Sequence, residues 1–187
     1  ELIQVVDIAG ISKSPSAFDL EKLTYFNSHY IRSMAPEEFA AAAEPYIRQP
    51  VQNPAIHTAE IADLLHQRTE TMNEIPEKVD FFDALPDYDV ALYTHKKSKT
   101  NSEISLEMLQ TILPRFEALA PWEPVGIKQV MTDLAEELGV KNAKVMWPVR
   151  IAIAGKAVTP GGAVEIAHIL GKEESLARMK RGIEKLS

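Results

Sequence analysis

Residues 145–154 read Val-Met-Trp-Pro-Val-Arg-Ile-Ala-Ile-Ala, and Gly155 follows them. Every residue of this stretch except Arg150 is apolar. A helix that is apolar all round is normally buried by its neighbours, and glycine allows the chain to turn where a helix ends. The stretch therefore predicts a buried helix over residues 144–154, after which the chain turns.

Apolar residues at helical spacing recur on both sides of this stretch. Runs of alternating β-branched residues are absent, so no segment predicts a strand. We expect four further helices before the connection described below, over 19–31 with Asp19 as the capping residue, from Pro36 to near Pro50, over 55–75 and over 76–82. After that connection we expect helices from Ser102 through Leu119, over 125–138, over 160–170 and over 172–186. Pro114 should kink or break the first of these later helices, and Gly139 should end the second. The sequence thus predicts an all-α fold.

The segment 83–100 predicts a connection between two helical subdomains. It holds Pro86, several acidic residues and the basic run His95-Lys96-Lys97-Ser98-Lys99, and such composition is typical of a linker. We expect residues 1–84 to form one subdomain and residues 85–187 to form a second one packed against it. The basic run could contact phosphate, but a solvated loop is the simpler interpretation.

The overall composition is typical of a globular protein. Hydrophobic residues make up 45% and charged residues 25% of the 187 residues, which argues against a disordered chain. No apolar run approaches the length of a membrane-crossing helix. Cysteine is absent, which excludes disulfides, thiolate zinc sites and cysteine nucleophiles and fits the reducing cytoplasm. Because the chain begins with Glu1 rather than Met, we expect a processed polypeptide or part of a longer one.

No catalytic constellation is evident. The five histidines have no metal-ligand spacing, and the chain contains neither a G-x-G-x-x-G motif nor a P-loop. No combination of serine, histidine and acid has the context of a nucleophile.

Charge is distributed unevenly along the chain. The net charge is −7, which by itself argues against a nucleic-acid partner. Residues 141–187, however, contain nine Lys or Arg and four Asp or Glu, whereas residues 1–140 contain eleven and 23. This asymmetry suggests that the last quarter of the chain faces an anion, but on charge alone solvated helix faces are the simpler explanation.

Two arginines interrupt apolar patterns. Arg150 lies in the apolar stretch above, and Arg68 falls on the same face as Ile61, Leu65 and Met72 of the helix expected over 55–75. A buried guanidinium costs several kcal/mol or more unless it has a partner. Each arginine is therefore either paired with an acid of this chain, extended to solvent, or available to a ligand.

The sequence Thr159-Pro160-Gly161-Gly162 predicts a helix start at which the backbone is accessible. Threonine can cap a helix, proline suits its first turn, and glycine leaves the amide groups uncovered. Because Gly155 lets the chain turn, Arg150 and this helix start could lie near each other. An ordinary capped helix packed closely on a neighbour would have the same sequence.

Several stretches together resemble the bacterial-type glutamyl-tRNA synthetases. The resemblance covers nearly the whole chain in the family's order. It rests on Ser12-Lys-Ser-Pro-Ser-Ala-Phe-Asp19, Lys22–Asn27 and Tyr30–Arg32, on Glu74-Ile-Pro-Glu-Lys78, and above all on Trp147-Pro-Val-Arg150, Ala154–Lys156, Thr159-Pro-Gly161 and Ile169–Arg178.

The resemblance implies an anticodon-binding helical bundle without the catalytic half of the family. Residues 1–84 would hold a remnant of the stem-contacting segment and the first anticodon-binding unit, and residues 85–187 the second. The motifs that bind ATP are absent, so ATP and magnesium are expected only for the longer protein, which would join glutamate to tRNA in the cytoplasm as a monomer.

The resemblance also implies roles for four residues in binding the anticodon loop of tRNA for glutamate. Arg68 aligns with an arginine that reads the third anticodon base, Arg150 with an arginine that contacts the anticodon, and Thr159 and Gly162 with contacts near the bases. Gly162 departs from relatives that carry a bulkier apolar residue, so a side-chain contact would be lost there. Anticodon bases can be splayed out, stacked on side chains and hydrogen-bonded along their edges, and a guanidinium is a rigid donor for such edges.

Two other interpretations remain. An all-helical protein-interaction scaffold would have both arginines paired internally, and their loss would mainly lower the melting temperature. An independent small enzyme is the weakest interpretation, because the chain lacks a nucleophile, a metal site and a phosphate loop.

Overall fold

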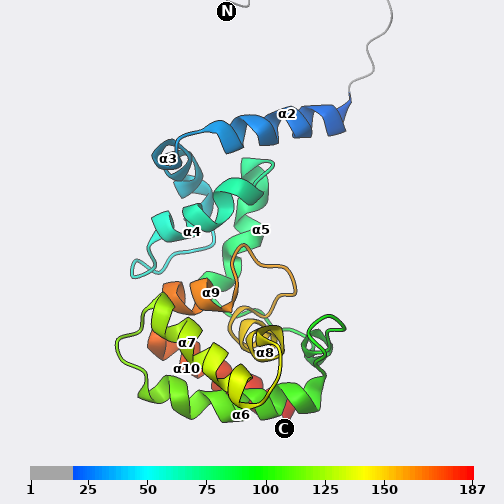
Figure 1. The fold of residues 1–187 in the computed structure, drawn as a ribbon. Helices are drawn as coiled ribbons and strands as arrows, with labels where there is room; N and C mark the ends of the chain where they lie inside the picture. Colours follow the sequence, from blue (N-terminus) through cyan, green and yellow to red (C-terminus); the bar gives the residue numbers. More distant parts are fainter. Residues whose placement is uncertain (1–18) are drawn as a thin grey trace, which may run out of the picture.

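The computed structural model describes residues 19–187, and the regular elements of this part are helices joined by turns and loops (Figure 1). The two-residue pairing of His95 with Thr100 is the one β-bridge in the described part. The expected all-α fold is therefore confirmed. The helices are α2 (Leu20–Ser33), α3 (Pro36–Ile47), α4 (Thr58–Leu65), α5 (Ile75–Val79), α6 (Ser102–Ala118), α7 (Pro124–Glu137), α8 (Asn142–Ala154), α9 (Ala163–Leu170) and α10 (Lys172–Leu186).

Helix α8 is the centre of the second half of the chain. Helices α6, α7, α9 and α10 all contact it, and most of its apolar side chains are fully buried. This confirms the burial predicted from its sequence. The helix ends at Gly155, whose φ of +63° is a conformation that glycine adopts without strain. A Cβ at Gly155 would also lie 2.9 Å from Cδ1 of Tyr88, so a larger residue would collide with its neighbour.

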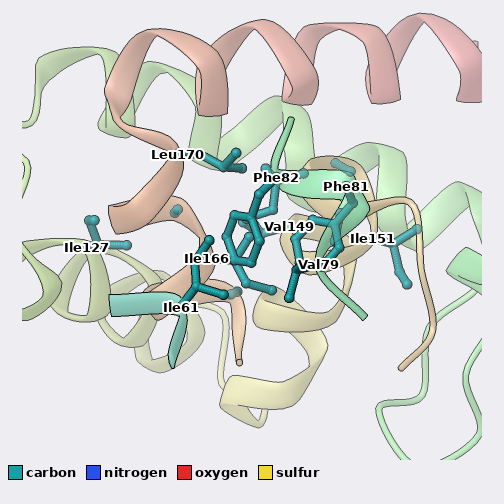
Figure 2. Close-up of a cluster of buried hydrophobic side chains, with 14 of the residues drawn as sticks. Ile61, Val79, Phe81, Phe82, Ile127, Val149, Ile151, Ile166 and Leu170 are labelled. Atoms are coloured by element: carbon teal, nitrogen blue, oxygen red, sulfur yellow. The ribbon is translucent and has the colours of Figure 1, made fainter. Parts of the chain in front are cut away.

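A continuous apolar core joins the early and late parts of the chain. Helices α2 to α5 lie toward one end of the molecule and α6 to α10 toward the other (Figure 1). Figure 2 shows Phe82 from the first part among Val149 of α8 and Ile166 of α9, with Ile61 of α4 close by. Each of these side chains is at most 1% exposed. Burying a large apolar side chain contributes about 1.5–3 kcal/mol, so this shared core fixes the two parts against each other.

Arg178 ties three segments together from inside this core. Its side chain is completely buried, and Nη1 donates to the carbonyls of Phe81 and Ile153 at 2.6 and 2.8 Å. Nη2 lies 3.5 Å from the carbonyl of Phe82, and Nε donates to Glu174 at 2.6 Å. Burial lowers the pKa of the guanidinium and the bond to Glu174 opposes this shift. A single residue of α10 thereby holds the end of α8 against the turn at residues 80–82.

The helix predicted over 55–75 is wrong in its second half. Helix α4 ends at Leu65, a 3-10 turn covers His66–Arg68, and the chain is extended at Thr69. The Thr69 hydroxyl donates to the carbonyl of Leu65 at 3.0 Å, and such local side-chain bonds compete with helix continuation. Beyond this break the amide of Glu70 donates to the carboxylate of Glu74, and a new turn begins at Met72.

Several helix starts also differ from the prediction, including α4 at Thr58 and α8 at Asn142. The helix expected from Pro160 begins at Ala163, and Gly162 is its capping residue. Helix α6 is capped by Asn101 rather than Ser102, because Oδ1 of Asn101 accepts from the amide of Ile104 at 2.8 Å. The same helix continues through Pro114 to Ala118. Asp19 caps α2 as predicted, whereas the predicted motif at 12–18 lies outside the described residues.

Candidate nucleic-acid interface

Arg150 has a half-buried guanidinium with an incomplete set of partners. Nη2 donates to the carbonyl of Ala157 at 3.0 Å, and the guanidinium carbon lies 4.5 Å from the centre of the Trp147 ring. The Nε atom is buried and has no hydrogen-bond acceptor within the described residues. No carboxylate of residues 19–187 forms an ion pair with Arg150. Burial lowers the pKa of this guanidinium, with no acid to oppose it.

A pocket of about 250 Å³, which we call the Arg150 pocket, opens beside this side chain. Its walls come from α8, from the start of α9 and from the basic run of residues 95–99. The residues that line it are Ser98, Ala143, Met146, Trp147, Arg150, Gly162 and Ala163. The structure therefore brings Arg150 and Gly162 together, as expected from the turn at Gly155.

Trp147 connects the Arg150 pocket to the basic run. Its indole stacks on the His95 ring with centroids 3.7 Å apart and planes 8° apart. The indole Nε1 donates to the carbonyl of Leu92 at 3.0 Å. The stacking and the hydrogen bond hold the half-buried Trp147 in place, and part of its side chain faces the pocket.

The segment 155–162, which contains Thr159, follows the helix that carries Arg150. Arg150 holds this segment at Ala157, and Lys156 reaches the carbonyl of Glu77. The Thr159 hydroxyl donates to the carbonyl of Gly161 at 2.7 Å, so it closes a local turn instead of capping the helix. A Cβ on Gly161 would lie 2.9 Å from Cδ1 of Leu64. The missing side chain therefore lets this segment pack directly on α4.

Arg68 lies in a second pocket, which we call the Arg68 pocket. Its volume is about 170 Å³, and its lining residues are Leu65, Arg68, Lys78, Val158, Thr159 and Pro160. The prediction that Arg68 lies within a buried helical stripe is wrong, because the helix ends before it and its side chain is exposed. Lys78 donates to the Arg68 carbonyl at 3.0 Å and to Glu74 at 2.7 Å, which fixes the backbone of Arg68.

The four residues predicted from the sequence thus line two neighbouring pockets that share the segment 155–162. Arg150 and Gly162 line one pocket, and Arg68 and Thr159 line the other. The segment 155–162 supplies a wall to both. Neither Arg68 nor Arg150 is paired with an acid in the part of the chain that the structure describes.

Several contributors to these pockets were not singled out from the sequence. Lys78 belongs to the Glu74–Lys78 motif and Met146 to the apolar stretch 145–154, and neither pattern marks the residue as part of a site. The basic run has the composition of a solvated loop, yet it contributes Ser98 to a pocket wall. The pockets bring Ser98 to Arg150 and Lys78 to Val158, which are about 50 and 80 positions apart, and the periodicity of a single sequence carries no signal of such pairing.

The arrangement offers hydrogen-bond donors and apolar walls. Within residues 19–187 no three His, Cys, Asp or Glu side chains are placed to hold a metal ion. No helix of this range combines the length and hydropathy that a bilayer crossing requires. The guanidinium groups beside these apolar walls, half-buried at Arg150 and exposed at Arg68, can hydrogen-bond base edges or phosphates while the ring faces pack against the walls.

Comparison with known sequences identifies the family. The family described as "Anticodon binding domain" matches residues 38–183. Glutamate–tRNA ligases of Clostridium botulinum strain Hall and of Clostridium tetani are 47% and 50% identical to the chain over 186 residues. In both comparisons all of this chain aligns with 38% of the relative, so the chain spans well under half the length of these ligases.

Solved structures show the same fold. The structure of a glutamate–tRNA ligase from Elizabethkingia meningosepticum, described as a complex with its amino acid, superimposes with a TM-score of 0.79 at 23% identity. It covers 100% of this chain and 36% of its own. A glutamate–tRNA synthetase from Elizabethkingia anophelis gives a TM-score of 0.74 at 24% identity, covering 98% of this chain and 35% of its own. With its helical fold and its match over residues 38–183, the chain belongs to the anticodon-binding domain family and corresponds to the anticodon-binding domain of glutamate–tRNA ligases.

Proposed function

We propose that this chain recognises the anticodon loop of the tRNA for glutamate through the Arg150 and Arg68 pockets. The observation that carries the proposal is the state of Arg150. Its guanidinium is half-buried, has one carbonyl acceptor and has no acid of residues 19–187 as an ion-pair partner. A desolvated cation gains most from a ligand that supplies acceptors. The edge of a splayed-out base, or a phosphate of the loop, supplies them.

Arg150 would read a base edge while apolar groups hold the base. The Arg150 pocket contains Met146, Ala163 and part of the Trp147 ring as apolar surface. Gly162 leaves the pocket entrance open, since a Cβ there would meet only the flexible carboxylate of Glu165, at 2.9 Å. Because Arg150 lies on the buried helix α8, its position is set before the RNA arrives, which lowers the entropy lost on binding.

Arg68 would contact the third anticodon base at the neighbouring pocket. Its side chain is exposed while its backbone is fixed by Lys78. The Thr159 hydroxyl already donates to Gly161, so toward a ligand it offers its oxygen as an acceptor. The two pockets then bind successive bases on either side of the segment 155–162.

The chemistry of ligation belongs, in this proposal, to the rest of a longer protein. That part would bind ATP and magnesium and join glutamate to the tRNA, and the whole would act as a monomer in the cytoplasm. The lack of cysteine fits that compartment. Residues 1–84 and 85–187 would serve as two units of one binding surface, with the Arg68 pocket formed where they meet.

The test is the affinity of the Arg150→Ala variant for glutamate tRNA. One specific base contact is worth about 1–3 kcal/mol, so we expect Kd to rise about 5- to 150-fold. Arg115→Ala is the matched control, because Arg115 is similarly half-exposed but is paired with Glu137 at 2.8 Å. Its Kd should match that of the wild type, and circular dichroism should show an unchanged fold for both variants.

The scaffold interpretation predicts a different pattern. It expects Arg150→Ala to lower the melting temperature and the wild type to bind glutamate tRNA no better than an unrelated tRNA. Equal affinity of the wild type and Arg150→Ala for glutamate tRNA would contradict the role assigned to the Arg150 pocket.

A further inference from the structure

The hairpin of residues 95–100 is a rigid loop that displays three lysines. His95 and Thr100 exchange backbone hydrogen bonds of 3.1 and 3.2 Å, and the amide of Lys99 donates to the carbonyl of Lys96. Lys99 has a φ of +55°, a left-handed conformation that costs a non-glycine residue about 1 kcal/mol. A left-handed residue is a common way to close a short hairpin loop, and here it helps to hold the loop in one geometry.

The hairpin is anchored to the wall of the Arg150 pocket. The amide of Ser98 donates to Nδ1 of His95 at 3.2 Å, and the Ser98 hydroxyl lies 2.9 Å from the same atom. The other attachment is the stacking of His95 on Trp147. Ser98 is buried and lines the Arg150 pocket. The neighbouring side chains of Lys96, Lys97 and Lys99 are exposed beside it.

The two segments that form most of this pocket are basic, whereas the start of α9 adds one acid, Glu165, which accepts from the amide of Gly162 at 3.0 Å. Residues 95–100 and 141–156 contain seven Lys or Arg and no acid. Lys96, Lys97 and Lys99 form no ion pair with any carboxylate of residues 19–187. Helix α8 begins at the same pocket without an acidic residue in its first turn and with Lys141 as its capping residue. Because a helix N-terminus carries partial positive charge, this placement is unfavourable unless an anion approaches.

We propose that the hairpin 95–100 binds backbone phosphates of the RNA whose base occupies the Arg150 pocket. This rests on the proposed function and adds a division of labour to it. Arg150 distinguishes bases, and the three hairpin lysines supply affinity that is independent of sequence. The protein carries a net charge of −7, so most of its surface repels RNA. A local cluster of cations would therefore direct the RNA to this face.

The two roles have different salt dependences. A phosphate contact to single-stranded RNA contributes about −0.7 to the slope of log K against log salt concentration. Three contacts contribute about −2 to the slope. They therefore raise the affinity about 100-fold at 0.1 M salt and leave it nearly unchanged near 1 M. A base contact changes the ratio of affinities for two tRNAs and has little influence on the slope.

The experiment compares Lys96→Gln/Lys97→Gln/Lys99→Gln with the wild type in salt titrations against glutamate tRNA and an unrelated tRNA. We expect the slope to become shallower by about 2 and the ratio of the two affinities to stay unchanged. The matched control, Lys128→Gln/Lys180→Gln/Arg181→Gln, removes the same charge from α7 and α10, outside both pockets. Its slope should remain that of the wild type.

Each alternative outcome is distinct. An unchanged slope for the hairpin variant, with normal wild-type binding, overturns this inference and leaves the proposed function standing. A changed affinity ratio shows that the lysines read bases, which also overturns it. An equal loss of slope in the control variant shows that the effect is one of net charge alone, and the inference fails. If the wild type binds neither tRNA, the proposed function and this inference fail together.

Discussion

Replacing Arg178 with methionine tests whether a buried guanidinium holds the two parts of the chain together. Methionine keeps the unbranched apolar stem of arginine and removes its five N–H donors. The carbonyls of Phe81 and Ile153, which receive bonds of 2.6 and 2.8 Å, then lose their donor inside the core. Glu174 loses a partner as well, but its side chain is 44% exposed, so its carboxylate can be hydrated.

The expected cost follows from these contacts. Each buried acceptor left without a partner costs about 1–3 kcal/mol, and two of them give about 2–6 kcal/mol. Removing the desolvation penalty of the guanidinium offsets part of this, because exchange of a buried ionic group for an apolar one can be favourable when no partner is orphaned. We expect a net loss of about 3 kcal/mol. For a chain of this size that lowers the melting temperature by about 6–12 °C.

Urea unfolding, followed by circular dichroism, measures the loss. Arg181→Met is the matched control, since Arg181 lies three residues further along α10 and is exposed. Its free energy of unfolding should stay within about 0.5 kcal/mol of the wild-type value. A loss below about 1 kcal/mol for Arg178→Met would refute the reasoning, because it would show that the two carbonyls find other donors.

Two glycine substitutions separate backbone strain from collision. Gly155→Ala combines a φ of +63° with a contact of 2.9 Å to the Tyr88 ring, so we expect it to lower the free energy of unfolding by about 2–4 kcal/mol. Gly139→Ala has the same strain at φ +62° and nothing within 4 Å, so in the same urea titration it should lose only about 1 kcal/mol, and equal losses would contradict the collision. Gly182→Ala would place a Cβ 2.7 Å from the Tyr93 hydroxyl, but alanine favours the helix by about 1 kcal/mol. We expect a net loss of about 1 kcal/mol in thermal unfolding, and a stabilised variant would show that Tyr93 moves aside.

The sequence predicts helices best where apolar content and end signals agree. The helix over 172–186 lies where expected, and α8 ends at the predicted glycine. Over 55–75 the apolar spacing continues across Thr69, but the threonine bonds to Leu65 and the chain becomes extended. Apolar periodicity carries no information about such a side-chain bond. Arg68 and Thr69 occupy positions that are compatible both with a continued helix and with an extended chain.

The candidate site was predictable as residues but not as an arrangement. Arg150 stands out because it interrupts an apolar helix, whereas Arg68 stands out only on a helix that is not there. The Arg150 pocket also needs Ser98, about 50 residues earlier in the chain and brought to Trp147 by the His95 ring. Contacts between such distant segments depend on the packing of the whole molecule.

Arg178 shows what this fold does with an arginine that has only a structural role. It is buried completely and receives two close backbone carbonyls and a carboxylate as acceptors. Arg150, on helix α8 of the same core, has one carbonyl acceptor and an Nε without an acceptor among the described residues. The same chain therefore satisfies one guanidinium and leaves the other short of acceptors. Since an unsatisfied buried donor costs about 1–3 kcal/mol, the deficit at Arg150 lowers stability, and under the proposed function a ligand rich in acceptors would recover that cost on binding.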